Sequence, residues 1–400
     1  MSALRAALAA LASFFVMGVF WGAWAALVPE IQLRTQATPP ELGAALLWAG
    51  AAALPAMLIT GRLWRRFGPG LVPVTLVLFG LVAVGPAVAP GVAALAVGLA
   101  LVGAASGALD VAMNAQVSQI EVTTGRRLMF LAHALFSLGV LLTSVAVGVL
   151  RTLAVEPLPI LAAVALAFVF VAALAVRGDR HGATRAASLD EPPPAPGGER
   201  IVTRGTIVLL GLLCAAAFLI EDAMVSWSAL HLERTLGAEP ALGSAGPGLF
   251  AGAMFAGRAL GQVVGRRFSD RTVLVGAGLV SAAGLAVVAW APTSLIALAG
   301  LVVAGLGVSL VGPALFSRAG RLAGARGRGA AIASLTVFGY TGFVVGPPLV
   351  GFIAGATELR ISFATLALLA LALAVVARLA LSKPAAGGMA ADELPPVARG

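Results

Sequence analysis

Twelve apolar segments, each long enough to cross a lipid bilayer, dominate the sequence. A membrane-spanning helix needs about 20 largely apolar residues, and the segments that meet this requirement fall into two groups of six. The first group is Leu8–Val28, Glu41–Ile59, Leu71–Val88, Val92–Gln116, Leu128–Leu150 and Leu158–Val176. The second is Thr206–Leu230, Gly246–Val264, Thr272–Trp290, Ser294–Phe316, Ala330–Ile353 and Ile361–Leu381. The pattern predicts an all-α integral membrane protein with twelve transmembrane helices.

The composition supports this class and excludes several others. The chain is 60% hydrophobic and only 11% charged, whereas soluble proteins carry about 25% charged residues. A single cysteine, Cys214, excludes an intrachain disulfide and any cysteine-based metal cluster. The sequence has no phosphate-binding G-x-x-x-x-G-K-[ST] loop, so we expect no ATP drive. We therefore predict no metal and no cofactor.

A polar run divides the chain into two nearly equal halves. Residues 177–204 are rich in Pro, Ser, Gly and charge, and such a segment buries too little apolar surface to fold. We predict an N-terminal six-helix bundle over residues 1–176, a flexible cytoplasmic linker over 177–204, a C-terminal six-helix bundle over 205–382 and a disordered cytoplasmic tail over 383–400.

The arginines predict the orientation, because loops rich in Lys and Arg stay on the cytoplasmic side. One set of loops holds Arg62, Arg65, Arg66, Arg126, Arg127, Arg266, Arg267, Arg271, Arg318, Arg321, Arg326 and Arg328. The opposite loops hold only Arg34, Arg151, Arg234 and Arg360. Both termini and the linker are therefore predicted to be cytoplasmic. The same placement explains the net charge of +9 without a nucleic-acid partner.

The two halves match each other at a fixed offset of 200 residues. The matching pairs are Arg34 with Arg234, Pro40 with Pro240, Gly43 with Gly243, Gly61 with Gly261, Arg66 with Arg266, Gly107 with Gly307 and Gly139 with Gly339. Six-helix halves related by an axis along the membrane normal form one transporter architecture. Chance matching in a chain of biased composition is the alternative.

With these features, the chain resembles the major facilitator superfamily. Each half has a glycine-arginine loop after its second span, with Gly61, Arg65 and Arg66 in the first half and Gly261 and Arg266 in the second. In the family pattern G-x-x-x-D-R-x-G an Asp precedes the Arg, but Arg65 and Gly265 occupy that position here. This departure puts the usual Asp-mediated gating latch in doubt.

Three further motifs resemble a bacterial inner-membrane group near the fucose-permease branch. They are Asp110-Val-Ala-Met-Asn114, Gly125-Arg-Arg-Leu-Met129 with His133-Ala-Leu-Phe-Ser137, and Glu221-Asp-Ala-Met-Val-Ser-Trp227. The resemblance implies two pseudo-symmetric six-helix bundles, alternating access and a multi-pass protein of the bacterial cytoplasmic membrane. We expect it to work as a monomer in the lipid bilayer and to have no enzymatic activity.

Placing an ionisable residue within a membrane span costs free energy, so such a residue is first interpreted as part of a functional site. Asp110 and Asn114 share one helix face with Gly103 and Gly107, which suits either a cavity-facing site or a helix contact. Glu221 and Asp222 lie in the seventh span, and adjacent residues point about 100° apart. We therefore expect one carboxyl, preferably Glu221, to face the cavity and carry a proton or contact substrate.

Those two carboxyls have a structural alternative, which is an ion pair with Arg258 of the eighth span. Arg258 is placed nearer the cytoplasmic side, so its expected depth argues against the pairing.

Four other side chains are candidates for solute contact, each with an ordinary alternative. His133 shares a face with Ser137 and is otherwise a packing residue. Trp21, Trp24 and Trp227 would stack on a solute ring or serve as interfacial anchors. Gly346 and Pro347 end a glycine-rich stretch resembling the family's gate motif, whose physical content is a bendable, closely packed helix.

These features predict a secondary active transporter, coupled to protons, for a small and sugar-like solute. The first alternative is a multidrug-type exporter of amphipathic cations, because Asp110, Glu221 and Asp222 make the central helices acidic. Alternatives of another class are a polytopic membrane enzyme and a non-transporting sensor. The enzyme would leave the 200-residue repeat unexplained.

Overall fold

The computed structural model describes residues 2–124, 128–179 and 203–381, and this part of the chain contains twelve α-helices and no strand. The first six helices are α1 (Ser2–Thr35), α2 (Pro39–Phe67), α3 (Leu71–Val82), α4 (Val92–Thr124), α5 (Met129–Thr152) and α6 (Pro157–Asp179). The second six are α7 (Arg204–Leu230), α8 (Pro240–Arg267), α9 (Asp270–Trp290), α10 (Ser294–Val308), α11 (Val311–Ala356) and α12 (Leu359–Ala380). The predicted flexible linker and disordered tail lie almost wholly outside the described residues.

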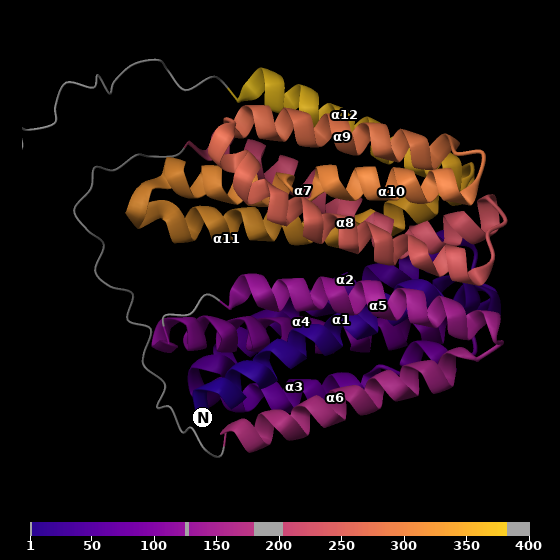
Figure 1. Ribbon diagram of the computed structural model, residues 1–400, viewed down its shortest axis with the longest axis horizontal. Helices are drawn as coiled ribbons and strands as arrows, with labels where there is room; N and C mark the ends of the chain where they lie inside the picture. Colours follow the sequence, from indigo (N-terminus) through magenta and orange to yellow (C-terminus); the bar gives the residue numbers. More distant parts are fainter. Residues whose placement is uncertain (1, 125–127, 180–202, 382–400) are drawn as a thin grey trace, which may run out of the picture.

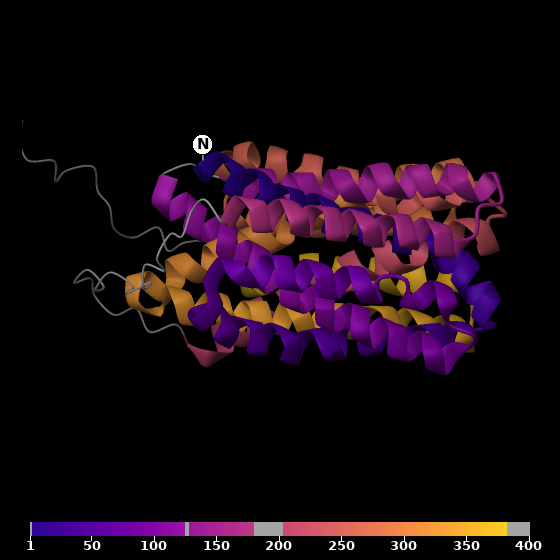
Figure 2. The same cartoon turned by 90° about the horizontal axis from the view of Figure 1, so that it is seen from below.

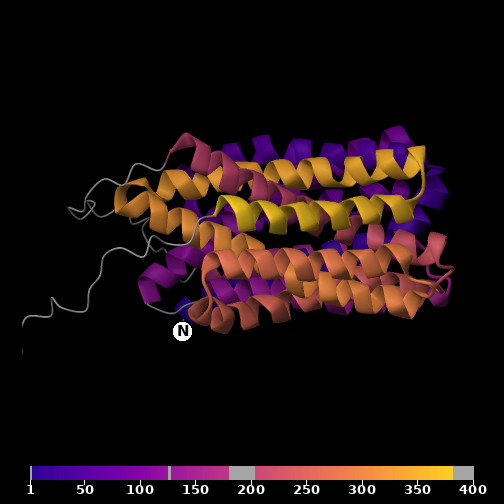
Figure 3. The same cartoon turned by 90° about the horizontal axis from the view of Figure 1, so that it is seen from above.

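The helices form two six-helix bundles, which confirms the predicted fold class. In Figure 1, α1–α6 lie in the lower half and α7–α12 in the upper half, with all helices close to the long axis. Figure 2 shows the N-terminal bundle in front and Figure 3 shows the C-terminal bundle in front. We call the end that carries the first residues of α1 and α7 the linker end, and the opposite end the Arg151 end.

The twelve predicted spans all coincide with helices, although their composition differs. Ten stretches of the described residues are long and apolar enough to cross a membrane, and one of them, Pro39–Val88, contains both α2 and α3. The helix α8 does not meet the criterion by itself. It carries Arg258 within its length and Arg266 and Arg267 at its end, and these lower its apolarity.

Several predicted boundaries were wrong, and the tenth span is the clearest case. The tenth span was predicted as Ser294–Phe316, but α10 ends at Val308 and the chain resumes as α11 at Val311. The 46-residue α11 folds back at the linker end, where it turns from the direction of α10 into the return path (Figure 1). Apolar length alone gives no signal for where a helix bends.

The 200-residue repeat is visible in the helix ends. The first helix ends at Thr35 and the π-helical turn after α7, His231–Thr235, ends at the equivalent Thr235. Likewise α2 ends at Phe67 and α8 at Arg267. The matched glycines lie at equivalent helix contacts. Gly139 of α5 packs on the backbone of α1, and Gly339 of α11 packs on side chains of α7.

The two bundles meet mainly along two helix pairs, α2 with α11 and α5 with α8. Small residues allow close approach of helix backbones within a membrane. A Cβ atom added to Gly43 of α2 would lie 3.0 Å from the Cα atom of Pro348 in α11, and one added to Gly148 of α5 would lie 3.1 Å from the Cα atom of Ala241 in α8. Gly43, Gly148, Ala241 and Pro348 all lie towards the Arg151 end, so the halves are tightly packed there.

Candidate functional site

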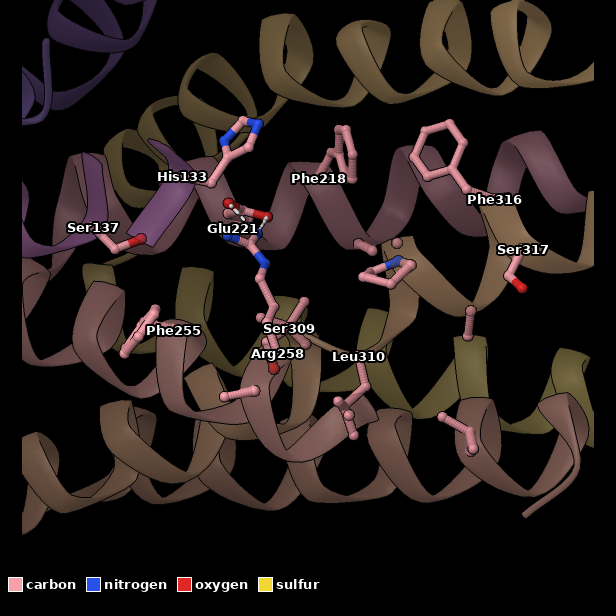
Figure 4. A pocket seen from close by; sticks show the side chains of 18 of the residues that line it. His133, Ser137, Phe218, Glu221, Phe255, Arg258, Ser309, Leu310, Phe316 and Ser317 are labelled. Carbon is pink, nitrogen blue, oxygen red and sulfur yellow. Dashed lines mark hydrogen bonds and ion pairs between the residues drawn. The ribbon is translucent and has the colours of Figure 1, made fainter. Parts of the chain in front are cut away.

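A cavity of about 730 Å³ lies between α5 of the first half and helices of the second half. Its lining includes Met129 and Asp270, the first residues of α5 and α9, so it reaches the linker end. It extends inward to Ser137 and Glu221. Figure 4 shows the inner part of this space, with Phe218 and Glu221 of α7 on one side and Phe255 and Arg258 of α8 on the other. Its volume is in the range of small-molecule sites, about 300–1,000 Å³.

An ion pair between Glu221 and Arg258 occupies the inner part of this cavity. The Nη2 atom of Arg258 donates to Oε1 of Glu221 at 3.2 Å and to Oε2 at 3.4 Å. The exposed fraction is 22% for the Glu221 side chain and 40% for that of Arg258, so both remain open to the cavity (Figure 4).

This pairing corrects the prediction that depth separates Glu221 from Arg258. The observed α8 runs from Pro240 to Arg267 and is longer at both ends than the predicted span, so counting residues from the ends of that span did not fix the depth of Arg258. In addition, the long arginine stem lets the charged head lie away from the level of its own backbone. Glu221 does line the cavity, as predicted, but it does so with a partner.

Asp222, the neighbour of Glu221, is not part of the cavity lining. The helix turn between the two residues directs Asp222 to another face of α7. No hydrogen bond from another described side chain reaches its carboxyl group. The structure therefore separates the two carboxyls in the way that the helix geometry predicts.

His133 of α5 lies on the cavity wall together with Ser137, on the face predicted from their spacing. Its ring also makes an edge contact with Phe14 of α1, at 5.1 Å between ring centroids. His133 thus packs against the N-terminal half on one side and faces the cavity on the other. Figure 4 places it directly above the Glu221–Arg258 pair.

Asp110 and Asn114 form a second polar cluster, outside the cavity lining. The Nδ2 atom of Asn114 donates to Oδ1 of Asp110 at 3.0 Å, and the hydroxyl of Tyr340 in α11 donates to Oδ2 at 3.2 Å. Asp110 therefore joins α4 to α11 across the two halves. The glycines of its stripe pack instead on α2, where a Cβ atom at Gly107 would lie 2.7 Å from the carbonyl oxygen of Ala53.

Two of the three candidate tryptophans are packing residues. Trp24 and Trp227 are 1% and 0% exposed, so they neither line the cavity nor reach a membrane interface. Trp21 is half-buried and contacts Phe20 edge-on at 5.4 Å between ring centroids, also away from the cavity lining. None of the three faces the solute path in this conformation, because the core of each bundle takes the largest rings.

The Arg151 end is closed by contacts between the halves. Arg151 of α5 donates from Nη1 to Oε1 of Glu233 at 2.5 Å and from Nη2 to Oε2 at 2.9 Å. The Nη1 atom also donates to the carbonyl oxygen of Ala26 at 2.9 Å and to Oγ of Ser244 at 3.1 Å. Both ionic side chains are buried, at 6% and 8% exposure. Further along α5, the hydroxyl of Ser144 donates to the carbonyl oxygen of Ser244.

The loop motifs lie at the linker end and are open there. Gly61, Arg65 and Arg66 are exposed, a Cβ atom on Gly61 would meet nothing within 4 Å, and Arg66 lies over the ring of Phe67. In the second half, Gly261 lies next to Leu310 and on the cavity wall. The backbone of Arg266 belongs to α8, but its side chain lies outside the described part of the structure.

An Asp at the start of α9 takes part in ion pairs that the loop motif did not predict. Asp270 binds Arg318 at 3.6 Å and also Arg321, both from α11. These contacts stay within the second half. The predicted gating role of Arg65, Arg66 and Arg266 is therefore a prediction about another conformation, in which the linker end closes.

The gate motif of α11 packs closely on two partner helices. A Cβ atom added to Gly346 would lie 2.8 Å from the carbonyl oxygen of Leu219 in α7. A Cβ atom added to Gly43 of α2 would lie 3.2 Å from the carbonyl oxygen of Pro347. The motif therefore joins α7 and α2, in keeping with its expected content of a closely packed helix.

Sequence reasoning did not single out three residues that the structure places in polar contacts between helices, namely Glu233, Tyr340 and Asp270. Tyr340 is the only tyrosine of the chain, and a lone polar ring inside an apolar span was the available signal. For Glu233, the signal was an acid next to Arg234 at the end of a span. Among the described residues, no cluster of three His, Cys, Asp or Glu residues could hold a metal ion.

Comparison with known proteins agrees with this architecture. Residues 9–339 and 255–396 match the model of the Major Facilitator Superfamily. An uncharacterised MFS-type transporter of Yersinia pestis is 33% identical over 370 residues, which cover 92% of this chain and 93% of that protein. An uncharacterised transporter of Sinorhizobium fredii is 29% identical, over 92% of this chain and 96% of its own.

Solved structures share the fold. The crystal structure of the nucleoside transporter NupG superposes with a TM-score of 0.75 at 11% identity, over 95% of this chain and 100% of that one. The finer resemblance to the fucose-permease branch stays a prediction. The family match and the relatives identify a multi-pass membrane transporter and not an enzyme, and the chain belongs to the Major Facilitator Superfamily.

Proposed function

We propose that the protein is a secondary active transporter that moves a small polar solute by alternating access, coupled to protons. One observation carries the proposal, namely that the cavity reaches the linker end while the buried Arg151–Glu233 pair closes the opposite end. A site accessible from one side, with the other side sealed by contacts between two pseudo-symmetric halves, is what alternating access requires.

The cavity lining suits a small polar solute. Hydroxyl groups come from Ser137, Ser309 and Ser317, and rings come from Phe218, Phe255 and Phe316. Such walls bind the apolar carbon face of a small molecule and fix its polar groups by hydrogen bonds. A sugar-like solute fits this description, and so do other compact polar molecules of similar size.

The charges of the lining favour this solute over an amphipathic cation. The two acidic side chains of the lining are Glu221 and Asp270, and both are engaged by arginines. An amphipathic cation would need an unengaged carboxylate in the cavity. The acidic side chains that face the solute space are already paired with arginines, so we rank the cation exporter as the second candidate.

Proton coupling is proposed through Glu221. This side chain lies deep in the cavity and remains 22% exposed, so water from the linker end can reach it. Its partner Arg258 forms an ion pair with it in the conformation described here. When that partner is withdrawn, the carboxyl would take up a proton. Asp110 is the alternative proton site.

For the cell, we propose the bacterial cytoplasmic membrane, with the linker end and both termini on the cytoplasmic side and a single chain as the working unit. The arginine-rich loops support this orientation, and the relatives named above come from bacteria. In this orientation the structure is inward-open.

The test is a thermal-shift screen followed by exchange across liposomes. Purified protein is screened against sugars, amino acids, organic acids and cationic drugs, because a ligand that binds the folded state raises its apparent stability. Each hit is then measured for counterflow in proteoliposomes. We expect saturable exchange of at least one hit. Binding without exchange by every hit would instead indicate a non-transporting sensor.

A further inference from the structure

Arg258 engages Glu221 with only one of its nitrogen atoms. Both hydrogen bonds come from Nη2, at 3.2 and 3.4 Å. A guanidinium group has five N–H donors in a planar fork, and Nε and Nη1 have no partner among the described residues. The side chain is 40% exposed and forms part of the cavity wall. Arg258 therefore presents unused donors to the space in which a solute would bind.

The other charged groups around the cavity cannot compete for those donors. Asp270 lies at the linker end and is held by Arg318 and Arg321. The other terminal nitrogen of Arg321, Nη1, donates a hydrogen bond to the hydroxyl of Ser317. Within the described lining, Arg258 is therefore the cation whose hydrogen-bonding capacity is least satisfied.

We propose that Arg258 is the subsite for a carboxylate group of the transported solute, and that Glu221 is the internal anion that this carboxylate displaces. The inference rests on the proposed transport function and names its substrate class, a small organic monoanion. A carboxylate matches the guanidinium fork with two parallel hydrogen bonds, which are stronger than those to a neutral group. A dianion would need a second free cation, and the described lining offers none.

The exchange has a simple charge balance. Solute carboxylate replaces Glu221 on Arg258, and Glu221 is then a second carboxylate beside the first. Two carboxylates in one site do not both stay ionised, so Glu221 takes up one proton from the water at the linker end. One anion and one proton are then bound together, with no net charge added. The other titratable groups near Glu221 are His133 of α5 and, on α7, Cys214 and Asp222.

Three probes of one shape test the proposal, namely benzoate, benzamide and benzylamine, which are anionic, neutral and cationic. Binding is measured by thermal shift on the wild type, on Glu221→Gln and on the double variant Glu221→Gln/Arg258→Gln. We expect benzoate to bind Glu221→Gln about tenfold more tightly than the wild type, because the competing carboxylate is gone. In the double variant, benzoate should bind no better than benzamide.

Calorimetry in two buffers of different ionisation enthalpy measures the proton. Benzoate binding should take up about one proton in the wild type and none in Glu221→Gln, as the charge balance requires. The variant Glu221→Gln/Arg258→Lys keeps the charge and loses the fork, so its benzoate affinity should fall between those of the other two variants. Of these variants, Glu221→Gln/Arg258→Gln removes both charges, so it leaves neither partner unpaired.

Several results would overturn the proposal. One is that benzoate raises the melting temperature of Glu221→Gln/Arg258→Gln as much as that of Glu221→Gln. Another is that benzylamine raises the melting temperature of the wild type but not that of Glu221→Gln. The absence of any benzoate shift in Glu221→Gln up to millimolar concentration is the third. A protein that gives one of these results but exchanges another solute across liposomes keeps the transport function and loses only the carboxylate subsite.

Discussion

Arg151 and Glu233 form a two-pronged ion pair between the halves, with N–O distances of 2.5 and 2.9 Å and both side chains almost completely buried. They come from helix ends that the sequence separates by 82 residues. Because the pair and its neighbour Ser244 tie α5, α8 and the turn after α7 together, it closes the Arg151 end. Any outward-open state must break it.

Breaking the pair should open the Arg151 end. Removing one partner of a buried pair leaves an uncompensated charge and costs about 3–5 kcal/mol, so Glu233→Gln should shift the population towards the other conformation. Spin labels at the exposed positions Leu153 and Glu239, in a Cys214→Ser background, report the distance between the halves. We expect a longer distance in Glu233→Gln.

The chain offers a matched control for this change. Arg34 and Glu156 also form an ion pair at 3.4 Å, but their side chains are 40% and 71% exposed and both belong to the first half. Exposed pairs contribute only about 0–1 kcal/mol, so Glu156→Gln should leave the label distances unchanged. Equal distances in Glu233→Gln and the wild type would show that the pair does not control this end.

Gly342 should be far less tolerant of a side chain than Gly61. A Cβ atom on Gly342 would lie 2.1 Å from the carbonyl oxygen of Ala215, which α7 cannot move without shifting its backbone. Overpacking of this kind costs about 1–3 kcal/mol. Gly342→Ala should therefore lower the melting temperature in detergent, whereas Gly61→Ala, with nothing within 4 Å, should not. Equal melting temperatures would mean that α7 and α11 are not packed as described.

Tyr340→Phe should loosen the contact between α4 and α11. The change removes only the hydroxyl that donates to Asp110, and side-chain hydrogen bonds within membranes are worth about 0.6–1.7 kcal/mol. Hydrogen exchange around Asp110 and Tyr340 should become faster, with a small loss of thermal stability. Val337→Ala is the control, since it alters an exposed side chain of the same helix. Unchanged exchange in Tyr340→Phe would remove Asp110 from any coupling between the halves.

Arg66→Ala should slow transport and leave the equilibrium affinity for the solute within a few-fold. The side chain is exposed at the linker end, lies over Phe67 and is absent from the cavity wall. We predict that Arg66 sets the orientation in the membrane and contributes to gating when the linker end closes. Titration of a screened ligand by thermal shift gives the affinity, and initial rates of exchange give the speed. A large loss of affinity would instead place this loop in the binding site.

The sequence predicts the frame of this protein far better than its contacts. Spans, bundles and repeat follow from apolar length and the offset of residues such as Pro40 and Pro240, because the bilayer leaves few alternatives to helices. The pairing of Glu221 with Arg258 did not follow. It depends on helix length, helix tilt and the reach of a long side chain, and none of these is fixed by counting residues along one helix.

The tryptophans show a second limit of the same kind. Both Trp24 and Trp227 lie in apolar spans, where a large ring suits a solute cavity, an interface or a packed core equally well. Which of these applies depends on the face that a neighbouring helix covers. Helix periodicity groups residues into faces, but the long-range packing that decides between faces has no local signal in so uniformly apolar a chain.

Glu221 and Asp222 provide the last prediction, because adjacent carboxyls of one helix have different surroundings. Glu221 lines the cavity and binds Arg258, whereas Asp222 does neither. Glu221→Gln should therefore abolish proton-driven accumulation in proteoliposomes and spare counterflow, which needs binding and alternating access without net proton movement. Asp222→Asn, the matched control, should retain accumulation and mainly lower thermal stability. The reverse pattern would move the proton site to Asp222. If both variants accumulate solute normally, Asp110→Asn is the deciding measurement, and normal accumulation there as well would exclude coupling through any of the three carboxyls.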